Sequence, residues 1–562
     1  MTITDPNLAL ATANAMLESG RLAEALDQLR EARDRYPWHA GVAARFADGL
    51  QSVGRLPEAV TAYALALQID PASTEAWYGA GCAHLALGAY GAAAAAFGKA
   101  CRLRPVSGAA HYNLAAALFQ LGRLESAIAH FERAARLDAE LEARAQANIA
   151  CIIPGSMDAD NATVLRVRRL WADQQTRALA QAPRSDAAAP ARDRTAAPPR
   201  TRKPRIGYLS AFFGNRNWMK AVFALINRHD RAAFEIHMFS DGDPPSSESG
   251  YRDHDADVVH DMRGADNERA AAHIAQWDID VLVDLNGYSF PSRLPLLMNR
   301  PAKQLVGWFN MFATTGLRAF DWIVGDAAVI PSREEPHYCE KVHRLPGTYT
   351  AFEVRYPVPE VAPPPCLAAN GAICFGYLGS QYKLTDAVIG SWAAILQRAP
   401  KADLFIKTAV LDDGSTQGDL RSRFEALGVD AARLRFAGSS EHFAFLGAYR
   451  NVDIALDTFP YSGGTTTMEA LWQGVPVLSF DGDRWASRTS KSLLLAAGLA
   501  EWSRPDRASY VEQAVRLATD PETPAMLARL RAGMRDQLSA SAACDADGMC
   551  NAMEAFYTQI VA

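Results

Sequence analysis

Glycines recur with a period of 34 residues over the first quarter of the chain, at Gly20, Gly54, Gly88 and Gly122. Other residues keep the same spacing: alanine five positions after each glycine, an aromatic residue nine positions after the last three, and proline 17 positions after the first three. Glycine allows a tight turn, alanine allows two helices to approach, and proline ends a helix. This period predicts a stack of helix pairs, because one such unit cannot bury its apolar face alone.

A 34-residue unit with this pattern is typical of tetratricopeptide repeats. Stacked repeats of this kind form an α-solenoid with a continuous concave groove that suits an extended peptide or a partner helix. We therefore predict a repeat domain over residues 1–150 that recruits a protein.

The chain after the repeats changes in character. Residues 151–203 are expected to form a helical connector, with a polar helix near Asn161–Ala180, followed by an Ala-, Pro- and Arg-rich linker. Beyond it, short apolar runs alternate with helical segments over residues 204–360 and again over 366–562. Such runs fit parallel strands that helices cover on both faces, so two Rossmann-like α/β domains with a shared ligand crevice are predicted. The expected strands are Ile206–Ser210, Phe234–Phe239, Val281–Leu285, Gln304–Trp308, Trp322–Gly325, Ala372–Leu378, Ala402–Lys407, Leu434–Ala437, Val452–Leu456 and Val475–Phe480.

Composition excludes several classes of function. The net charge of −6 and the short basic runs give no electrostatic footprint for nucleic acid. No apolar stretch is long enough to span a bilayer, and the first residues lack the order of a secretory signal, so a cytoplasmic protein is expected. The eight cysteines are scattered without a Cys-x-x-Cys pair, which favours reduced core residues over a metal site or disulfides.

The densest chemistry lies in a loop of the second α/β domain. A strand is expected to end at Asp457, after which Gly463 and Gly464 precede a helix that opens with Thr465 and Thr466. Free N–H groups and the helix dipole favour an anion at such a site, and threonine hydroxyls add donors. This loop is a candidate diphosphate cradle. Glu469, one turn further on, could accept hydrogen bonds from a ribose. The alternative is ordinary helix capping by Thr465, with Glu469 as a favourable first-turn acid.

Other polar residues are expected near the same crevice. Lys383 follows a strand and could reach a leaving diphosphate, although it could also be a solvated surface lysine. His442 could lie against a nucleobase or serve only as a capping or core residue. Asn286 follows another strand end and could orient a ligand or simply form an Asn-Gly turn. Thr314 and Thr315 form a second hydroxyl-rich loop that could contact a nucleotide sugar.

Together these features resemble protein glycosyltransferases that join tetratricopeptide repeats to a two-domain GT-B fold, the family of O-GlcNAc transferase and SPINDLY proteins (glycosyltransferase family 41), in a bacterial form. The matching segments are Gly207–Ser210, Asp284–Tyr288, Arg300–Ala302, Tyr382–Lys383, Glu441–His442, Asp457–Thr458, Thr465–Thr466 and Met468–Gly474 with Pro476.

The resemblance implies an inverting transfer of a sugar from a nucleotide diphosphate to a Ser or Thr hydroxyl of a protein, with no cofactor and no metal. By the same resemblance, Lys383 neutralises the departing diphosphate, Thr465 and Thr466 hold its oxygens, Glu469 binds the ribose and His442 stacks on the base. Preorganised positive groups can stabilise a leaving diphosphate in this way.

Some positions depart from the family pattern. Arg216 and Lys220 stand where the family has histidines, Gly464 replaces another histidine, and Asn310–Phe312 replaces Gly-Tyr-Pro. Arginine cannot act as a general base at neutral pH, so the base is expected to differ. Arg216 and Lys220 could instead bind a negative group on an acidic donor sugar.

Three functions compete at this stage. The leading hypothesis is a protein O-glycosyltransferase that uses UDP-GlcNAc and captures its acceptor with the repeats. A second is a flagellin glycosyltransferase that uses a CMP-nonulosonic acid, for which Arg216 and Lys220 would suit the donor carboxylate. A third is a non-catalytic repeat scaffold with a degenerate GT-B domain, although a scaffold has no need of a phosphate site.

Overall fold

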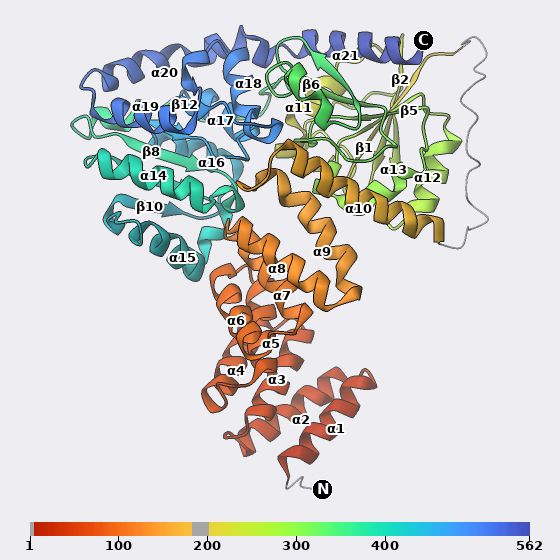
Figure 1. Cartoon of the computed structure of the whole chain (residues 1–562), viewed down its shortest axis with the longest axis vertical. Coiled ribbons are helices and arrows are strands. Elements are labelled where there is room, and N and C mark those ends of the chain that lie inside the picture. Colours follow the sequence, from red (N-terminus) through yellow and green to blue (C-terminus); the bar gives the residue numbers. More distant parts are fainter. Residues whose placement is uncertain (1–4, 182–201) are drawn as a thin grey trace.

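The computed structural model describes residues 5–181 and 202–562. A helical arm leads up to two α/β lobes that lie side by side (Figure 1). Most of the predicted linker, residues 182–201, lies outside the described part of the chain.

The arm consists of antiparallel helix pairs, as the repeat predicts. Gly20, Gly54, Gly88 and Gly122 lie at the turns between paired helices with φ of 77°, 79°, 73° and 74°, a conformation that favours glycine. The alanine five positions after each glycine is fully buried. These observations confirm the repeat fold. The helices of the arm and connector are α1 (Pro6–Glu18), α2 (Leu22–Arg35), α3 (Ala40–Ser52), α4 (Leu56–Ile69), α5 (Thr74–Ala86), α6 (Tyr90–Leu103), α7 (Gly108–Gln120), α8 (Leu124–Leu137), α9 (Ala139–Ile152) and α10 (Asn161–Gln181).

Each lobe is built on a parallel sheet. The first lobe has the strand order β3-β2-β1-β4-β5-β6-β7 and the second the order β10-β9-β8-β11-β12-β13. The strands are β1 (Arg205–Ser210), β2 (Glu235–Ser240), β3 (Val258–Asp261), β4 (Val281–Asp284), β5 (Gln304–Gly307), β6 (Trp322–Asp326), β7 (Lys341–Leu345), β8 (Cys374–Leu378), β9 (Asp403–Lys407), β10 (Leu434–Ala437), β11 (Ile454–Leu456), β12 (Val477–Phe480) and β13 (Ser503–Arg504).

Helices cover both sheets, which confirms the predicted pair of doubly wound lobes. They are α11 (Arg216–Ile226), α12 (Asn267–Gln276), α13 (Leu294–Met298), α14 (Asp386–Arg398), α15 (Gly414–Glu425), α16 (His442–Gly447), α17 (Thr465–Trp472), α18 (Thr489–Ala496), α19 (Arg507–Thr519), α20 (Thr523–Ser539) and α21 (Ala546–Val561).

Sequence patterns located the central strands and missed three others, β3, β7 and β13. These three lie at sheet edges and are only partly buried, so they lack the continuous apolar runs on which the prediction relied.

The order of the strands places two switch points in the cleft between the lobes. In the first sheet the chain reverses its direction of travel between β1 and β4, and in the second between β8 and β11. Open α/β sheets bind ligands beyond the carboxyl ends of such strands. A ligand is therefore expected at the loops after these four strands.

The last helix corrects the predicted domain boundary. Helix α21 packs against the first lobe, where Met553, Phe556 and Tyr557 join the same buried cluster as Tyr208 and Val283. The segment 366–562 is therefore not one compact unit, because its end completes the core of the preceding lobe. Figure 1 shows α21 lying over that lobe.

The fourth repeat contacts the second lobe directly. Arg423 Nη1 of α15 donates to the carbonyl oxygen of Leu121 at 2.7 Å, and Arg123 forms an ion pair with Asp419 at 2.5 Å. A Cβ added to Gly122 would lie 2.4 Å from the carbonyl oxygen of Leu384. Glycine at this turn therefore has two roles. It adopts the positive φ that the turn of the repeat requires, and it leaves room for the backbone of the second lobe.

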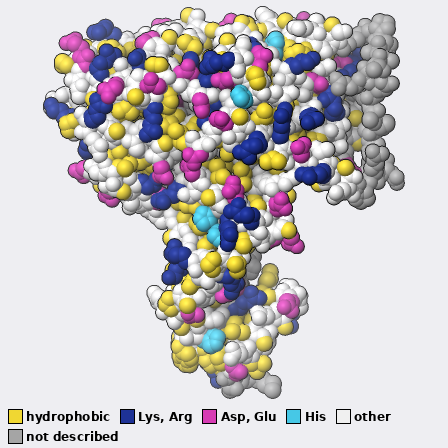
Figure 2. All heavy atoms as spheres, viewed as in Figure 1, with side chains coloured by type: hydrophobic (Ala, Val, Ile, Leu, Met, Phe, Trp, Pro, Cys, Tyr) yellow, Lys and Arg dark blue, Asp and Glu magenta, His cyan; other side chains and the backbone are white. Residues whose placement is uncertain are grey.

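The surface carries charges of both signs. Figure 2 shows Lys and Arg side chains interspersed with Asp and Glu side chains over the visible face of the lobes. No helix in the described part of the chain has the length and apolar character that a membrane crossing requires.

Candidate functional site

The loop between β11 and α17 is fixed by a buried carboxylate. Asp457 Oδ1 accepts a hydrogen bond from the Gly463 N–H at 2.7 Å, and Oδ2 accepts one from the Ser479 hydroxyl at 2.6 Å. A Cβ on Gly463 would lie 2.3 Å from Thr467 Oγ1, whereas a Cβ on Gly464 would lie 3.4 Å from its nearest neighbour. A Cβ at position 463 therefore has no room unless Thr467 shifts, whereas a Cβ at 464 has room.

Helix α17 presents its N-terminus to this loop. Thr465 is the first residue of the helix and Gly464 is the N-cap, which makes no side-chain cap hydrogen bond. The alternative that Thr465 caps the helix is therefore wrong. Thr465 and Thr466 are half-buried, and the dipole of the helix gives this end positive potential. The arrangement can accept an anionic ligand.

Lys383 faces the same loop from the end of β8. Its Nζ donates to the carbonyl oxygen of Ser462 at 2.9 Å and lies 4.3 Å from the centre of the Tyr461 ring. Burial lowers the pKa of Lys383 to about 8, and the nearby Asp457 carboxylate opposes that change. In the described residues no carboxylate forms an ion pair with this amine. The side chain is thus a cleft lysine and not a solvated surface residue.

A second lysine crosses from the first lobe to the second. Lys220 of α11 forms an ion pair with Glu469 of α17, and both side chains are buried, at 4% and 6% exposure. His442 Nε2 lies 3.0 Å from Glu469 Oε1 and 3.1 Å from Lys220 Nζ. Tyr356, on the segment between the lobes, covers the group: Lys220 Nζ lies 4.5 Å from its ring centre and His442 meets it edge-on. We call these four residues the interlobe cluster.

The interlobe cluster holds Glu469 in its charged form. Burial opposes ionisation, but contacts with His442 and Lys220 outweigh it and keep the pKa of Glu469 below its ordinary value. Burial lowers the pKa of Lys220, and the Glu469 carboxylate opposes that shift. The ribose-binding role expected of Glu469 and the base-stacking role expected of His442 stay predictions, and in this conformation both side chains contact each other and Lys220.

Asn286 sits at the switch point of the first sheet. Its Oδ1 accepts from the Ala211 N–H at 2.8 Å, and its buried Nδ2 has no hydrogen-bond partner in the described residues. Asp284 holds the same turn by accepting from the backbone N–H groups of Asn286 and Gly287 at 3.0 and 3.1 Å. Burial raises the pKa of Asp284 to about 7. The unpartnered amide is consistent with a ligand-orienting role, which stays a prediction.

Thr314 and Thr315 use their hydroxyls inside the protein. Both donate to the Glu340 carboxylate, Thr314 at 2.8 Å, and both threonines are almost fully buried. In this conformation neither threonine has a hydroxyl free to donate to a nucleotide sugar, the contact predicted from the sequence. Arg216 is half-buried, and its Nε donates to the carbonyl oxygen of Glu248.

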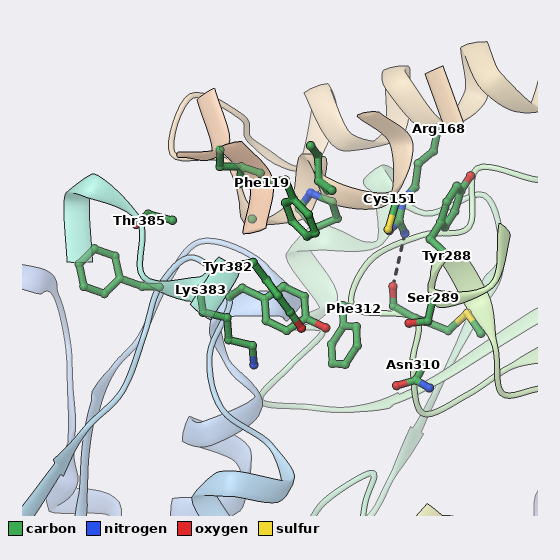
Figure 3. A pocket seen from close by; sticks show the side chains of 17 residues that line it. Phe119, Cys151, Arg168, Tyr288, Ser289, Asn310, Phe312, Tyr382, Lys383 and Thr385 are labelled. Carbon is green, nitrogen blue, oxygen red and sulfur yellow. Dashed lines mark hydrogen bonds between the residues drawn. The ribbon is translucent and has the colours of Figure 1, made fainter. Parts of the chain in front are cut away.

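A cavity of about 100 Å³ lies where the arm and both lobes meet. Figure 3 shows Phe119, Tyr382, Lys383 and Phe312 around it, with Arg168 and Tyr288 at one side. Its lining is mostly apolar and consists of Phe119, Leu124, Cys151, Ile152, Pro154, Gly155, Arg168, Tyr288, Ser289, Asn310, Met311, Phe312, Tyr382, Lys383, Thr385, Phe459 and Tyr461. Lys383 thus faces the loop of Gly463 and also lines this cavity.

Sequence reasoning missed three residues that shape the site. Asp457 is predicted only as the end of a strand, although an acid at a strand end before two glycines is a signal for its role in holding the loop. Arg168 of α10 is buried and donates to the carbonyl oxygens of Ala150 and Thr314 at 3.1 and 2.6 Å. Phe119 reaches the cavity from the fourth repeat. No local signal marked either of these two residues.

One group of described residues has the composition of a metal site: His229, Cys550 and Glu554, where α21 meets the first lobe. His229 Nδ1 lies 2.9 Å from Glu554 Oε1, and its Nε2 lies 2.6 Å from the Tyr208 hydroxyl. Each ring nitrogen of His229 already has a hydrogen-bond partner. We therefore interpret the group as a hydrogen-bonded contact that holds α21 against the first lobe. All eight cysteines are free, and four of them are buried.

Comparison with known proteins agrees with this geometry. Residues 189–359 and 367–553 match glycosyl transferase family 41, and residues 44–107 and 78–142 match tetratricopeptide repeats. The chain is 29% identical over 360 residues to a probable UDP-N-acetylglucosamine–peptide N-acetylglucosaminyltransferase SPINDLY of Solanum lycopersicum, a match that covers 63% of this chain and 38% of that protein. A similar match to the Arabidopsis thaliana SPINDLY protein covers 39% of it. The chain thus spans well under half the length of these relatives.

Among solved structures, a variant of the Thermobaculum terrenum O-GlcNAc transferase is similar over nearly its whole length. The TM-score is 0.75 with 28% sequence identity, and the match covers 93% of this chain and 98% of that one. The similarity therefore includes the repeats as well as both lobes.

Proposed function

Because the chain belongs to glycosyltransferase family 41, we propose that it transfers a sugar from a nucleotide diphosphate to a Ser or Thr hydroxyl of a protein held by the repeats. UDP-N-acetylglucosamine is the proposed donor, in keeping with the names of the relatives. The observation that carries the proposal is the Lys383 amine, which faces the N-terminus of α17 across the loop of Gly463 with no carboxylate paired to it among the described residues.

These groups suit a leaving diphosphate. In the proposed reaction the acceptor hydroxyl oxygen bonds to the anomeric carbon while the bond from that carbon to the diphosphate breaks. The electron pair of that bond leaves with the phosphate oxygen, and the hydroxyl proton passes to solvent or to the departing diphosphate. Lys383, the N–H groups at the start of α17 and the hydroxyls of Thr465 and Thr466 would stabilise the charge that develops there. Groups that are already oriented before the reaction stabilise the transition state most, because they need no reorganisation during the reaction.

The interlobe cluster leaves one oxygen of Glu469 available to a ribose. Lys220 and His442 both contact Oε1, whereas Oε2 makes no hydrogen bond among the described residues. The acidic-donor alternative loses its main support, since Lys220 is paired with Glu469 and Arg216 with a backbone carbonyl. The repeats would hold the acceptor, which is not proposed to be flagellin.

A donor panel tests this function. Thermal shifts with UDP, GDP and CMP identify the nucleotide, because a ligand that binds only the folded state raises the melting temperature. Mass spectrometry of proteins co-expressed with the enzyme then gives the attached mass. We expect a shift with UDP and an added N-acetylhexosamine. A shift with CMP alone would favour the nonulosonic acid alternative, and no shift with any nucleotide together with no modified protein would favour the scaffold.

A further inference from the structure

The carboxylate of Glu469 lies one turn from the end of α17 that is proposed to hold the diphosphate. Residues four positions apart share one face of a helix, and their side chains lean toward its N-terminus, so Glu469 lies beside Thr465. Both residues line the same small cleft. A negative charge at this place repels a bound diphosphate and competes with it for the positive end of the helix dipole.

Little water screens this charge, because the Glu469 side chain is only 6% exposed. The same residue is the acid proposed to accept from the ribose. A nucleotide diphosphate therefore needs Glu469 as a hydrogen-bond acceptor and is opposed by its charge. A cation paired with the carboxylate resolves this conflict if it leaves one carboxylate oxygen free.

Lys220 is such a cation, and it comes from the other lobe. Its Nζ pairs with Glu469 Oε1, and His442 Nε2 lies 3.0 Å from the same oxygen. Oε2 makes no hydrogen bond among the described residues, so it stays available to a ribose. The Tyr356 ring faces the ammonium group at 4.5 Å, and the negative face of an aromatic ring favours a cation there.

The two partners of Glu469 differ in how firmly they hold a charge. The imidazole of His442 is charged only when it is protonated, whereas the ammonium group of Lys220 forms an ion pair with the carboxylate. Lys220 is therefore the group that cancels the charge of Glu469 independently of the state of His442. Its own contacts are Glu469, His442 and Tyr356, so it acts on a ligand through Glu469.

We propose that Lys220 is a positioning residue for the nucleotide diphosphate: it cancels the charge of Glu469, so that the carboxylate accepts from the ribose without repelling the diphosphate at the start of α17. The inference rests on the proposed function and assigns part of donor binding to the first lobe. The donor site of the second lobe is then complete only when α11 lies against α17.

Two ligands that differ only in the diphosphate test the inference. Isothermal titration with the full-length protein measures the Kd of UDP and, by competition, the Kd of uridine, and the ratio of the two reports what the diphosphate contributes. In Lys220→Met this preference for UDP is expected to fall about tenfold, because UDP then meets an uncompensated carboxylate. Uridine carries no charge, and its own Kd is expected to change by about threefold at most.

Variants of Glu469 separate charge compensation from a purely structural role. The double variant Lys220→Met with Glu469→Gln has no charge to compensate, so its preference for UDP should return to within about threefold of the unaltered protein. The single variant Glu469→Gln retains the Lys220 charge, and its preference should exceed that of the double variant by about tenfold. This second comparison keeps the test valid if Lys220→Met does not fold, which circular dichroism shows.

The matched control is Lys303→Met. Lys303 Nζ pairs with the buried Asp280 at 2.9 Å, so the control also removes a lysine from a buried carboxylate of the first lobe. Asp280 precedes β4 and thus lies at the amino end of the sheet, away from the cleft. Lys303→Met is expected to keep the preference for UDP. Lys220→Arg keeps the charge and should stay within about threefold of the unaltered protein.

Four outcomes would overturn the inference. They are a preference for UDP that is unchanged in Lys220→Met, one that falls equally in Lys303→Met, one that stays low in the double variant, and one that is equal in Glu469→Gln and the double variant. An equal weakening of UDP and uridine belongs to the first outcome and would show that Lys220 only ties the lobes. If the unaltered protein binds neither UDP nor GDP nor CMP, the proposed function itself fails, whereas each of the four outcomes leaves that function intact.

Discussion

Two lysines face the cleft, Lys220 buried and Lys383 half-buried, and they differ in what they contact. Lys220 is paired with the Glu469 carboxylate and is covered by Tyr356, so its charge is compensated within the protein. Lys383 has a backbone carbonyl and an aromatic face as its contacts, and burial brings its pKa down to about 8. A buried charge without a paired partner is costly to keep.

The difference separates a lysine that holds the lobes together from one that is available to a ligand. The pair of Lys220 and Glu469 joins α11 of the first lobe to α17 of the second. Perturbed and uncompensated ionisable groups cluster at functional sites, which favours Lys383 as the ligand-binding group.

The largest expected effect is on catalysis. Lys383→Met should lower kcat for sugar transfer by about 10³-fold, since loss of one preorganised charge-stabilising group typically costs 10²–10³-fold. The melting temperature should change little, because the amine has no ion pair to lose in the described residues. Lys401→Met, at an exposed position outside the cleft, is the matched control. Near-normal transfer by Lys383→Met would remove this residue from the mechanism.

The loop opposite Lys383 offers a second test in which two neighbouring glycines are compared. Gly463→Ala should weaken UDP binding and transfer by about 10²-fold, because its Cβ would lie 2.3 Å from Thr467 Oγ1 and would displace the backbone. Gly464→Ala, with 3.4 Å to its nearest neighbour, should change them by about threefold at most. Isothermal titration with UDP measures binding. If UDP binding falls equally in the two variants, the effect at position 463 does not come from the contact between the added Cβ and Thr467 Oγ1.

The contrasting lysine should matter to stability. Lys220→Met leaves the Glu469 carboxylate buried with His442 as its remaining partner, so unfolding in urea should show a loss of about 3 kcal/mol. The double variant Lys220→Met with Glu469→Gln removes the stranded charge and should recover more than half of that loss. If the free energy of unfolding of the single variant falls by less than about 0.5 kcal/mol, the pair contributes no more than a weak surface ion pair. It would then not be what holds the two lobes together.

A feature of the fold or the site could be predicted from sequence where the residues that produce it lie close together in the chain. The glycine period located the turns of the arm, and apolar runs located the central strands such as β1 and β8. The loop of Gly463 and the lysine after β8 follow from motifs that lie within a few residues. The pairing of Lys220 with Glu469 joins positions 249 residues apart, and the return of α21 to the first lobe depends on tertiary packing. No pattern of neighbouring residues indicates either the Lys220–Glu469 pair or the return of α21. The edge strands β3, β7 and β13 were missed because their burial is incomplete.

The smallest expected effect is a pH dependence that distinguishes the two lysines directly. Below pH 8 the Lys383 amine is mostly protonated. Above pH 8 the charge is lost, because burial lowers the pKa of this amine from its ordinary 10.5 to about 8. Since kcat/KM reports ionisations of the free enzyme, kcat/KM for the donor should fall about tenfold per pH unit above pH 8. Lys383→Arg keeps its charge throughout this range, so its lower kcat/KM should stay level up to pH 9.5. Assays of both proteins from pH 6.5 to 9.5 make the comparison. A decline of the same steepness in Lys383→Arg would assign the titration to another group, and a flat profile in the unaltered protein would show that the amine is not needed in its charged form.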